Sequence, residues 1–597
     1  MAYVWKNVSL AQLSKVKEGS MINLKINNIP VSVPEGTTVL EAAKSVGIKI
    51  PTLCYMKEIN AIGACRVCMV EVKGARSLMA ACVYPVAEGM EVFTNTPKVR
   101  AARKTTIELI LSNHRKDCLS CDRNLNCELQ QLALEYGCDA HRFEGAMTPS
   151  EIDNSTNYLV RDNSKCVLCR RCVAVCAKTQ AVGVIGPNER GFNTHIACAF
   201  EEPLATASCV ACGQCINVCP TGALHEVEEI DKVMAAINDP EKVVVVGPAP
   251  SVRAGLGEEF GYPIGTNVEG KMVTALRMLG FDKIFDVNFA ADMTIVEEAH
   301  ELIERVTKGG VLPMFTSCSP GWIRFLEYYY PELIPNLSTC KSPQQMVGAL
   351  AKTWWSEKFG VPAKNIYVVS IMPCTAKKYE KVRGSQSASG YPDIDAVLTT
   401  RELAKMIKGS GILFNELPDG EMDNPMGEFS GAGVIFGATG GVMEAALRTA
   451  AEKITGKELD SVEFTAVRGT KGIKEATYKV GDMDVKVAVA SGLANAKEIC
   501  EKVKKGEADY HFIEIMSCPG GCVNGGGQPI QDSFTRHNED ILAKRASVLY
   551  KQDENMPVRK SHENPVTKVV YSTYLGEPGG EKAHHILHTK YVDRKNK

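Results

Sequence analysis

Hydrophobic and polar residues follow two different rhythms along the chain. Near the N-terminus, the segments 22–26 (Ile-Asn-Leu-Lys-Ile) and 31–33 (Val-Ser-Val) alternate with a period of two, which predicts two strands around a polar turn. Thr38 and Glu41 follow in a capping-box pattern, which predicts that the helix VLEAAKSVG begins there. We therefore expect a small domain of strands and one helix, preceded by an N-terminal extension over residues 1–20.

After Glu226 the pattern changes to short, continuous, β-branched runs that alternate with helical patterns. Three such runs cover residues 242–246, 365–371 and 485–489. Continuous apolar strands between helices are typical of a parallel sheet with both faces buried. Ligands of open α/β sheets bind beyond the carboxyl ends of the strands. Cysteines follow the runs 311–315, 371–372 and 513–515, so we expect these cysteines to converge on one site.

Composition narrows the class of protein. At about 150 residues per domain, 597 residues suggest roughly four domains. The net charge of −2 does not indicate a basic surface for nucleic acid. No apolar run approaches the ~18 residues of a membrane span. The 23 cysteines would suggest disulfides in a secreted protein. Short C-x2-C spacings and the absence of a visible export signal instead favour metal ligation in a reducing cytoplasm.

Two cysteine runs have the spacing of a pair of iron–sulfur cubes. Residues 166–176 read C-x2-C-x2-C-x3-C, and residues 209–220 repeat that spacing and add a proline. In this arrangement three thiolates bind one [4Fe–4S] cluster and the fourth cysteine binds the other cluster. The predicted ligand sets are Cys166, Cys169, Cys172 and Cys219 for one cluster, and Cys209, Cys212, Cys215 and Cys176 for the other.

Two further sets of ligands lie upstream. Cys54, Cys65, Cys68 and Cys82 suggest a [2Fe–2S] cluster in a ferredoxin-like fold, although their first gap is longer than the plant-type spacing, and a structural zinc site is the alternative. The second set, His114, Cys118, Cys121 and Cys127, suits a [4Fe–4S] cluster or zinc, and its place between two predicted electron carriers favours the cluster. Cys138, Cys198 and Cys500 have no partners at ligand spacing, so we interpret them as core residues.

Three segments carry the remaining chemistry of the large domain. They are 315–322 (FTSCSPGW), 372–380 (MPCTAKKYE) and 514–527 (EIMSCPGGCVNGGG). Each alone is a strand-end turn with a buried thiol, but together they suggest ligands gathered from three loops. The segments resemble the three signature motifs of [FeFe]-hydrogenases, TSCCPxW, MPCxxKxxE and ExMxCxxGCxxG, and the resemblance covers residues 21–597.

The resemblance implies an H-cluster, which is a [4Fe–4S] cube joined through a cysteine to a two-iron subsite with CO, cyanide and a dithiolate amine. By the family pattern Cys374, Cys518 and Cys522 would ligate the cube, and Cys522 would bridge to the subsite. Lys377 and the backbone at Pro250 and Ser251 would hydrogen-bond cyanide, and Met372 and Met516 would pack around the subsite. The family's proton route would contain Cys318, Glu298, Ser338, Glu301 and Arg305.

One position departs from the family motif. Ser319 stands where the family has a cysteine that ligates the cube. A serine hydroxyl is a poor iron ligand near neutral pH because it does not lose its proton readily. Three interpretations stay open: Ser319 is a weak or absent ligand, Cys318 ligates instead, or Ser319 is an engineered change.

We therefore expect an iron–sulfur enzyme that interconverts H2 with protons and electrons, with one [2Fe–2S] cluster, three [4Fe–4S] clusters and an H-cluster. The chain has no G-x-G-x-x-G after a strand and no Walker A motif, so a partner must supply electrons. The N-terminal motifs resemble catalytic subunits of NAD-linked, electron-bifurcating hydrogenases and the cluster-bearing subunit of respiratory complex I. This predicts flavin- and NAD-binding partner subunits and ferredoxin.

The alternatives are a stand-alone, ferredoxin-dependent hydrogenase and a non-catalytic H2 sensor. The expected fold class is multidomain α/β and α+β, with ferredoxin-like domains before a large α/β domain with parallel sheets. The expected domains are 21–98 for the [2Fe–2S] cluster, 99–140 for the His/Cys3 cluster, 141–225 for the two cubes and 226–597 for the H-cluster.

Overall fold

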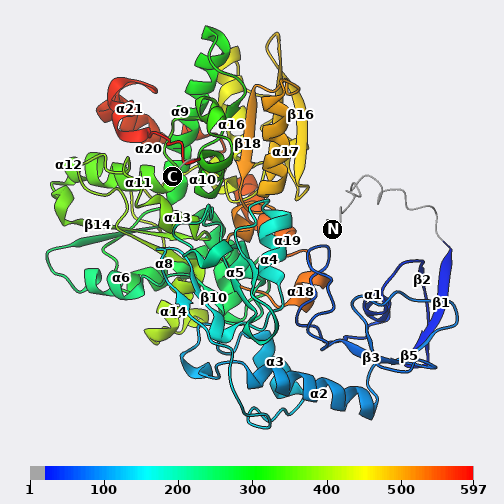
Figure 1. Ribbon diagram of the computed structural model, residues 1–597. Coiled ribbons are helices and arrows are strands. Elements are labelled where there is room, and N and C mark those ends of the chain that lie inside the picture. The colour runs from blue at the N-terminus through cyan, green and yellow to red at the C-terminus, as the bar shows by residue number, and fades with distance from the viewer. Residues whose placement is uncertain (1–19, 596–597) are drawn as a thin grey trace.

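The structure is a computed structural model that describes residues 20–595. The expected N-terminal extension therefore lies outside the described residues, apart from its last residue. In Figure 1 a small lobe built from β1, β2, α1, β3 and β5 stands beside a larger body that contains the C-terminal two thirds of the chain. No helix in the described part is both long and apolar enough to cross a membrane.

The N-terminal lobe contains a five-stranded sheet with the strand order β2-β1-β5-β3-β4. The first two strands form the expected hairpin, and its turn residues Asn27 and Asn28 both have positive φ, which asparagine tolerates better than most residues. Its elements are β1 (Met21–Ile26), β2 (Ile29–Pro34), α1 (Val39–Ser45), β3 (Met69–Val72), β4 (Met79–Ala80) and β5 (Glu91–Phe93).

Helix α1 begins as expected, but only half of the capping box forms. The Thr38 side chain accepts a hydrogen bond from the Glu41 backbone N–H at 3.3 Å. The Glu41 carboxylate instead accepts a hydrogen bond from the Tyr55 hydroxyl at 2.9 Å. The tertiary contact has therefore replaced the local one.

Two helices and a short ferredoxin-like region connect the lobe to the large body. Helix α2 begins after Thr96, whose side chain caps it, and Pro97 occupies its first turn, where a missing N–H costs nothing. The elements are α2 (Pro97–Ser112), α3 (Glu128–Glu135), β6 (Ile152–Asp153), β7 (Val160–Asp162), α4 (Arg171–Ala174), β8 (Gly186–Asn188), β9 (His195–Ala197), α5 (Gln214–Val218) and β10 (Leu224–His225).

The large domain has two four-stranded sheets. The first has the order β12-β11-β14-β15 with every pair parallel, and the second has the order β13-β18-β17-β16 with β16 and β17 antiparallel. The strands are β11 (Val243–Pro248), β12 (Lys283–Ile284), β13 (Met314–Phe315), β14 (Ile366–Met372), β15 (Ala396–Thr399), β16 (Ile473–Val480), β17 (Met483–Ser491) and β18 (Phe512–Met516).

Helices cover both sheets. The earlier ones are α6 (Ile230–Ile237), α7 (Pro250–Gly255), α8 (Glu269–Met278), α9 (Val287–Lys308), α10 (Pro320–Tyr329), α11 (Pro343–Leu350), α12 (Ser356–Phe359) and α13 (Ala376–Glu380). The later ones are α14 (Thr400–Gly409), α15 (Gly431–Ile435), α16 (Gly441–Thr455), α17 (Leu493–Lys504), α18 (Ser533–Asn538), α19 (Ile541–Asn555), α20 (Pro565–Val570) and α21 (Glu581–Leu587).

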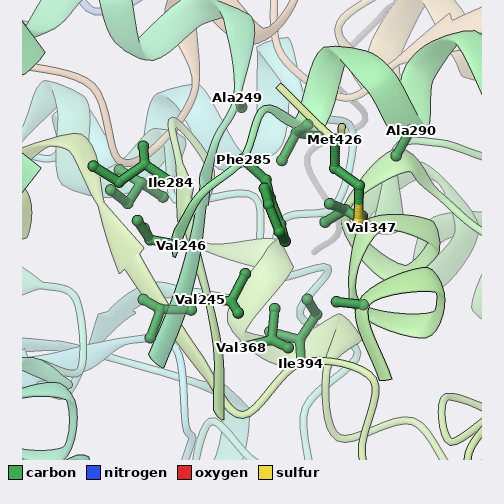
Figure 2. Close-up of a cluster of buried hydrophobic side chains, with 14 of the residues drawn as sticks. Val245, Val246, Ala249, Ile284, Phe285, Ala290, Val347, Val368, Ile394 and Met426 are labelled. Atoms are coloured by element: carbon green, nitrogen blue, oxygen red, sulfur yellow. The ribbon is translucent and has the colours of Figure 1, made fainter. Parts of the chain in front are cut away.

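The largest apolar core lies between the first sheet and its helices. Figure 2 shows Val245 and Val246 of β11 and Val368 of β14 in the same cluster as Phe285, with Val347 of α11 beside it. The packing fixes the carboxyl ends of β11 and β14 against α9 and α11. Those strand ends carry residues of the site described below.

The expected fold class is confirmed, with parallel strand pairs in both four-stranded sheets. The runs 242–246 and 365–371 lie in the first sheet, and the run 485–489 lies in the second, as part of β17. A continuous apolar run indicates that both faces of a strand are buried, but the run does not show which strand is its neighbour in the sheet.

Candidate metal centres

A buried cavity lies where three strands end at their carboxyl termini. Strands β13, β14 and β18 lead into the loops that carry Cys318, Cys374, Cys518 and Cys522, and all four line the cavity. The volume of the cavity is about 70 Å³. The expectation that these cysteines converge agrees with this placement.

The cavity thiols are suited to hold a metal cluster. Burial raises the pKa of the Cys522 thiol to about 12 and also raises the pKa of Cys374 and Cys518. A metal would displace these protons, because only thiolates ligate iron. Three buried thiols that converge from two loops fit the cube of an H-cluster.

Ser319 lies on the same cavity wall, at the start of helix α10. Its hydroxyl is 2.8 Å from the Ser517 hydroxyl, and its oxygen accepts a hydrogen bond from the Ser517 backbone N–H at 3.2 Å. The Ser319 hydroxyl therefore already has protein partners. Because Cys318 lines the same cavity, both Ser319 and Cys318 remain candidates for a fourth ligand.

The other expected cofactor contacts surround the cavity, with one exception. Pro250, Met372, Met516 and Lys377 line it. The Lys377 ammonium donates to the Cys318 carbonyl at 3.1 Å and pairs with Glu380 at 3.0 Å. Ser251 is buried behind the wall, where its hydroxyl donates to the Gly437 carbonyl at 3.3 Å.

Three residues of the expected proton route, Glu298, Glu301 and Arg305, lie along helix α9, from a fully buried position to partly exposed ones. The Glu298 carboxylate accepts hydrogen bonds from the Ser317 backbone N–H and hydroxyl, both at 3.3 Å. Farther along helix α9, Glu301 accepts from the Ser338 hydroxyl at 2.9 Å and from Arg305 at 2.7 Å. Burial and the Glu301 charge raise the pKa of Glu298 to about 8.

Two residues beside this route were not singled out from the sequence. The Cys340 thiol lies 3.9 Å from the Glu301 carboxylate, and His588 lies beside them. His588 in turn contacts Glu297 at 3.0 Å. No spacing rule finds this group, because its members come from three separate parts of the chain.

The first N-terminal set is compact. The sulfur atoms of Cys68 and Cys82 are 3.4 Å apart. Hydrogen bonds from Cys65 and Cys82 lower the pKa of the Cys54 thiol, which places all four thiols in one group. Their mutual contact suits a small cluster held by four thiolates.

The second N-terminal set includes a buried imidazole. Burial lowers the pKa of His114 to about 4, and its Nδ1 has no hydrogen-bond partner among the described residues. A neutral imidazole with a free lone pair is suited to bind a metal. Cys127 is buried and Cys121 partly so, whereas Cys118 is exposed. Zinc and an iron–sulfur cluster both fit this donor set.

The last cysteine of each repeated run lies near three cysteines of the other run. A small cavity of about 20 Å³ is lined by Cys166, Cys169, Cys172 and Cys219. In the other set, the charge of Cys176 raises the pKa of Cys212 and Cys215. Each group therefore combines three thiols of one run with the last thiol of the other.

The second of these groups adjoins the cavity at the ends of β13, β14 and β18. Cys212 lines that cavity together with Cys374 and Cys518. Thr375, next to Cys374, donates a hydrogen bond to the Ala211 carbonyl at 2.7 Å. The ferredoxin-like region thus lies directly against the wall of this cavity.

Family models match the whole arrangement. They are "2Fe-2S iron-sulfur cluster binding domain" (19–97), "NADH-ubiquinone oxidoreductase-G iron-sulfur binding region" (103–142), "4Fe-4S dicluster domain" (165–223), "Iron only hydrogenase large subunit, C-terminal domain" (242–526) and "Iron hydrogenase small subunit" (539–594). Fold and thiol groups together define a multicentre iron–sulfur oxidoreductase.

The chain belongs to the [FeFe]-hydrogenases. It is 48% identical to the NADP-reducing hydrogenase subunit HndD of Solidesulfovibrio fructosivorans, over 96% of this chain and 99% of the relative. It is 46% identical to iron hydrogenase 1 of Clostridium pasteurianum, over 96% and 100%. A structure of a variant of the [FeFe]-hydrogenase HydA1 from Chlamydomonas reinhardtii matches with 44% identity and a TM-score of 0.55, over 61% of this chain and 98% of that one.

The predicted family, the enzyme class and the likeness to a complex I subunit are therefore confirmed. The chain is an iron hydrogenase that acts on H2 and carries iron–sulfur domains upstream of its H-cluster domain.

Proposed function

We propose that this chain is the catalytic subunit of a multimeric, electron-bifurcating hydrogenase that couples H2 to NAD(P) and ferredoxin. The observation that carries the proposal is the match to HndD over nearly the full length of both chains, since HndD is named as a subunit of an NADP-reducing hydrogenase. The complex I-type region at 103–142 supports the same interpretation. The partners would bind the flavin and the nicotinamide, because this sequence has no dinucleotide motif.

The proposed cofactors are one [2Fe–2S] cluster, three [4Fe–4S] clusters and the H-cluster, held by the ligands given above. The proposed domains are 21–98, 99–140, 141–225 and 226–597. Cys212 on the cavity wall would bring the last electron-transfer cluster next to the H-cluster. We place the protein in the cytoplasm, where nicotinamide coenzymes and ferredoxin are available.

When bound, the H-cluster supplies the redox chemistry that interconverts H2 with protons and electrons. Cys374, Cys518 and Cys522 would hold it, with Ser319 as a weak or absent fourth ligand. Lys377 would donate to a cyanide from a position fixed by Glu380 and the Cys318 carbonyl. Pro250 and Ser251 would offer backbone contacts, and Met372 and Met516 would exclude water from the subsite.

Protons would pass between the cavity and the surface through Cys318, Glu298, Ser338, Glu301 and Arg305. The buried Cys318 thiol lines the cavity, and its pKa is raised by burial and by the neighbouring Glu298 charge. Replacing Cys318 by alanine should reduce turnover by roughly 10²- to 10⁴-fold, the contribution of a positioned proton-transfer group. Unchanged H2 evolution with intact CO and cyanide infrared bands would remove Cys318 from the route.

A stand-alone, ferredoxin-dependent hydrogenase is the second candidate. The full-length match to iron hydrogenase 1 favours it, because that name includes no partner subunit. A non-catalytic H2 sensor is a third, less favoured possibility.

Purification of the tagged chain from its native host, without oxygen, separates the candidates. If the chain belongs to the proposed complex, a flavin-containing subunit should co-purify with it. The purified complex should then show NAD(P)-dependent H2 turnover that the isolated chain lacks. Recovery of the chain alone, with full turnover on ferredoxin, would instead support the stand-alone enzyme. Infrared bands with no turnover on any electron carrier would favour the sensor.

A further inference from the structure

We propose that Glu301, Cys340 and His588 form a binding site for a zinc-type divalent cation at the outer part of the proposed proton route. One potential ligand atom from each residue lies within 4.8 Å of the other two. Glu301 comes from helix α9, Cys340 precedes helix α11, and His588 directly follows helix α21. A bridge between the backbones of Cys340 and His588 holds the two segments together.

The donor set matches zinc chemistry. Thiolate, imidazole and carboxylate are the three protein ligands that zinc uses, at ~2.0–2.3 Å. Small side-chain rotations would bring these atoms to bonding distance, and a water would complete a tetrahedron. Cys340 is 1% exposed and His588 8%, so the cation would be largely shielded from competing solvent.

The surroundings of His588 resemble the support of a metal-binding histidine. Its Nε2 faces the fully buried Glu297 carboxylate at 3.0 Å, and that carboxylate also accepts from the Gly579 backbone N–H at 2.9 Å. A carboxylate that accepts from Nε2–H fixes the tautomer in which the Nδ1 lone pair can bind a metal. In the structure Nδ1 lies 2.7 Å from the Thr339 hydroxyl, and a cation at Nδ1 would replace that hydrogen bond.

The charge balance also favours a cation. Glu297, Glu298 and Glu301 lie together, and among residues 20–595 their salt-bridge partners are Arg305 and His588. Binding would displace the Cys340 thiol proton to solvent and add positive charge to this acidic group. The Glu301 side chain is 16% exposed, which gives the cation a path from the surface.

A cation bound at this site should block proton transfer along the proposed route, because Glu301 cannot carry a proton while it ligates the cation. This consequence rests on the proposed proton route, whereas binding itself does not. Zinc would then be a reversible inhibitor that binds none of the proposed cluster ligands.

The test uses the intact, cluster-loaded enzyme, freed of loose metal with a chelator and titrated with zinc chloride. We expect one additional zinc per chain, a zinc X-ray absorption spectrum with one sulfur at ~2.3 Å, and a loss of turnover that chelator reverses. Cys340→Ala, which lies outside the proposed route, should keep its zinc-free turnover. Its inhibition midpoint should rise at least ~10-fold, the lower range for disturbing a metal site.

Two further variants serve as a control and as a second test of the site. Cys500→Ala removes a buried thiol from a different apolar cluster and should remain as zinc-sensitive as the parent enzyme. His588→Gln should lose the additional zinc even if Cys340→Ala folds poorly. Equal zinc content and equal inhibition in the parent and Cys340→Ala would overturn the site. Zinc bound through Cys340 without inhibition would uphold the site and remove Glu301 from the proton route.

Discussion

Glu298 is a buried carboxyl group that has no cationic partner among the described residues. One of its oxygens accepts two hydrogen bonds from Ser317, and the other is buried with no partner among the described residues. Burial, reinforced by Glu301, raises the pKa from its ordinary 4.5 to about 8. At pH 7 the side chain is therefore mostly a neutral acid, which can donate a proton as well as accept one.

This protonation state predicts a pH-dependent signal. A carboxylic acid infrared band should be present at pH 7, fade as the pH rises through about 8, and be absent in Glu298→Gln. Turnover of that variant should fall roughly 10²- to 10⁴-fold. Glu304→Gln, at a side chain 45% exposed on the same helix, should change neither property. A band that survives in Glu298→Gln would assign it to another group.

The same shift has a consequence for stability. Between pH 4.5 and about 8 the folded protein holds a proton on Glu298 that the unfolded chain has lost. The contribution of this group to the free energy of unfolding therefore decreases as the pH rises through that interval. Glu298→Gln should accordingly lose less thermal stability than the parent enzyme between pH 5 and pH 8.

Ser319 gives the third prediction at this scale. Its hydroxyl is engaged by Ser517, and iron prefers thiolate to an un-ionised hydroxyl. Ser319→Cys should therefore hold the H-cluster cube more firmly, seen as higher iron retention after chelation and altered infrared bands. Both forms must be expressed with the maturation machinery. Identical iron content, infrared bands and turnover would show that Ser319 is not at a ligand position.

At the scale of elements, helix α5 shows why the ferredoxin-like repeat uses a different residue beside the active site. Gly213 and its repeat counterpart Arg170 both precede a short helix with φ near 60–70°, at +68° and +61°. The left-handed backbone alone therefore does not require glycine here. A Cβ at Gly213 would lie 2.4 Å from the Thr375 hydroxyl oxygen and 2.9 Å from the Gly526 Cα. Glycine is therefore required because these two loops approach the backbone so closely.

Gly213→Ala should therefore disturb the contact between the two regions. We expect a cost of about 1–3 kcal/mol from overpacking, added to the backbone cost. Gly191→Ala is the matched control, because Gly191 has φ +62° and nothing within 4 Å of its Cβ position. Thermal unfolding and H2-driven dye reduction of both variants provide the comparison. Equal losses would mean that the close approach contributes nothing beyond backbone strain.

The parts of the molecule that the sequence predicts are those set by local spacing. Within each cysteine run, ligands two or three residues apart must face one centre, and the β1–β2 hairpin follows from local alternation. The group of Cys340, His588 and Glu297 could not be found this way, because tertiary packing brings it together from α9, the loop before α11 and the C-terminal end of α21.

At the scale of the whole molecule, hydrogen bonds join neighbouring metal centres. Asn60 donates to the carbonyls of both Cys54 and Cys169, at 2.8 and 2.9 Å, and so links the first centre to the ferredoxin-like region. Arg123, from the His114 segment, donates to the Cys219 carbonyl at 2.8 Å. The N-terminal lobe and the α2–α3 segment in Figure 1 thus both reach the same four-thiol group. Two routes for electrons would merge there before the last group and the active site.

The position of Cys212 makes this route testable. Cys212→Ala should remove the last iron–sulfur cluster before the active site. The variant should therefore lose H2-driven reduction of ferredoxin or a dye. Exchange of hydrogen between H2 and heavy water should continue, because exchange needs protons at the active site but no net flow of electrons. Cys198→Ala, in the same region but without a ligand role, should retain both activities. Infrared bands of the H-cluster must be intact in both variants. Dye reduction that survives in Cys212→Ala would show that electrons leave the cavity without this cluster, and the proposed chain of centres would then not be the path to the partner.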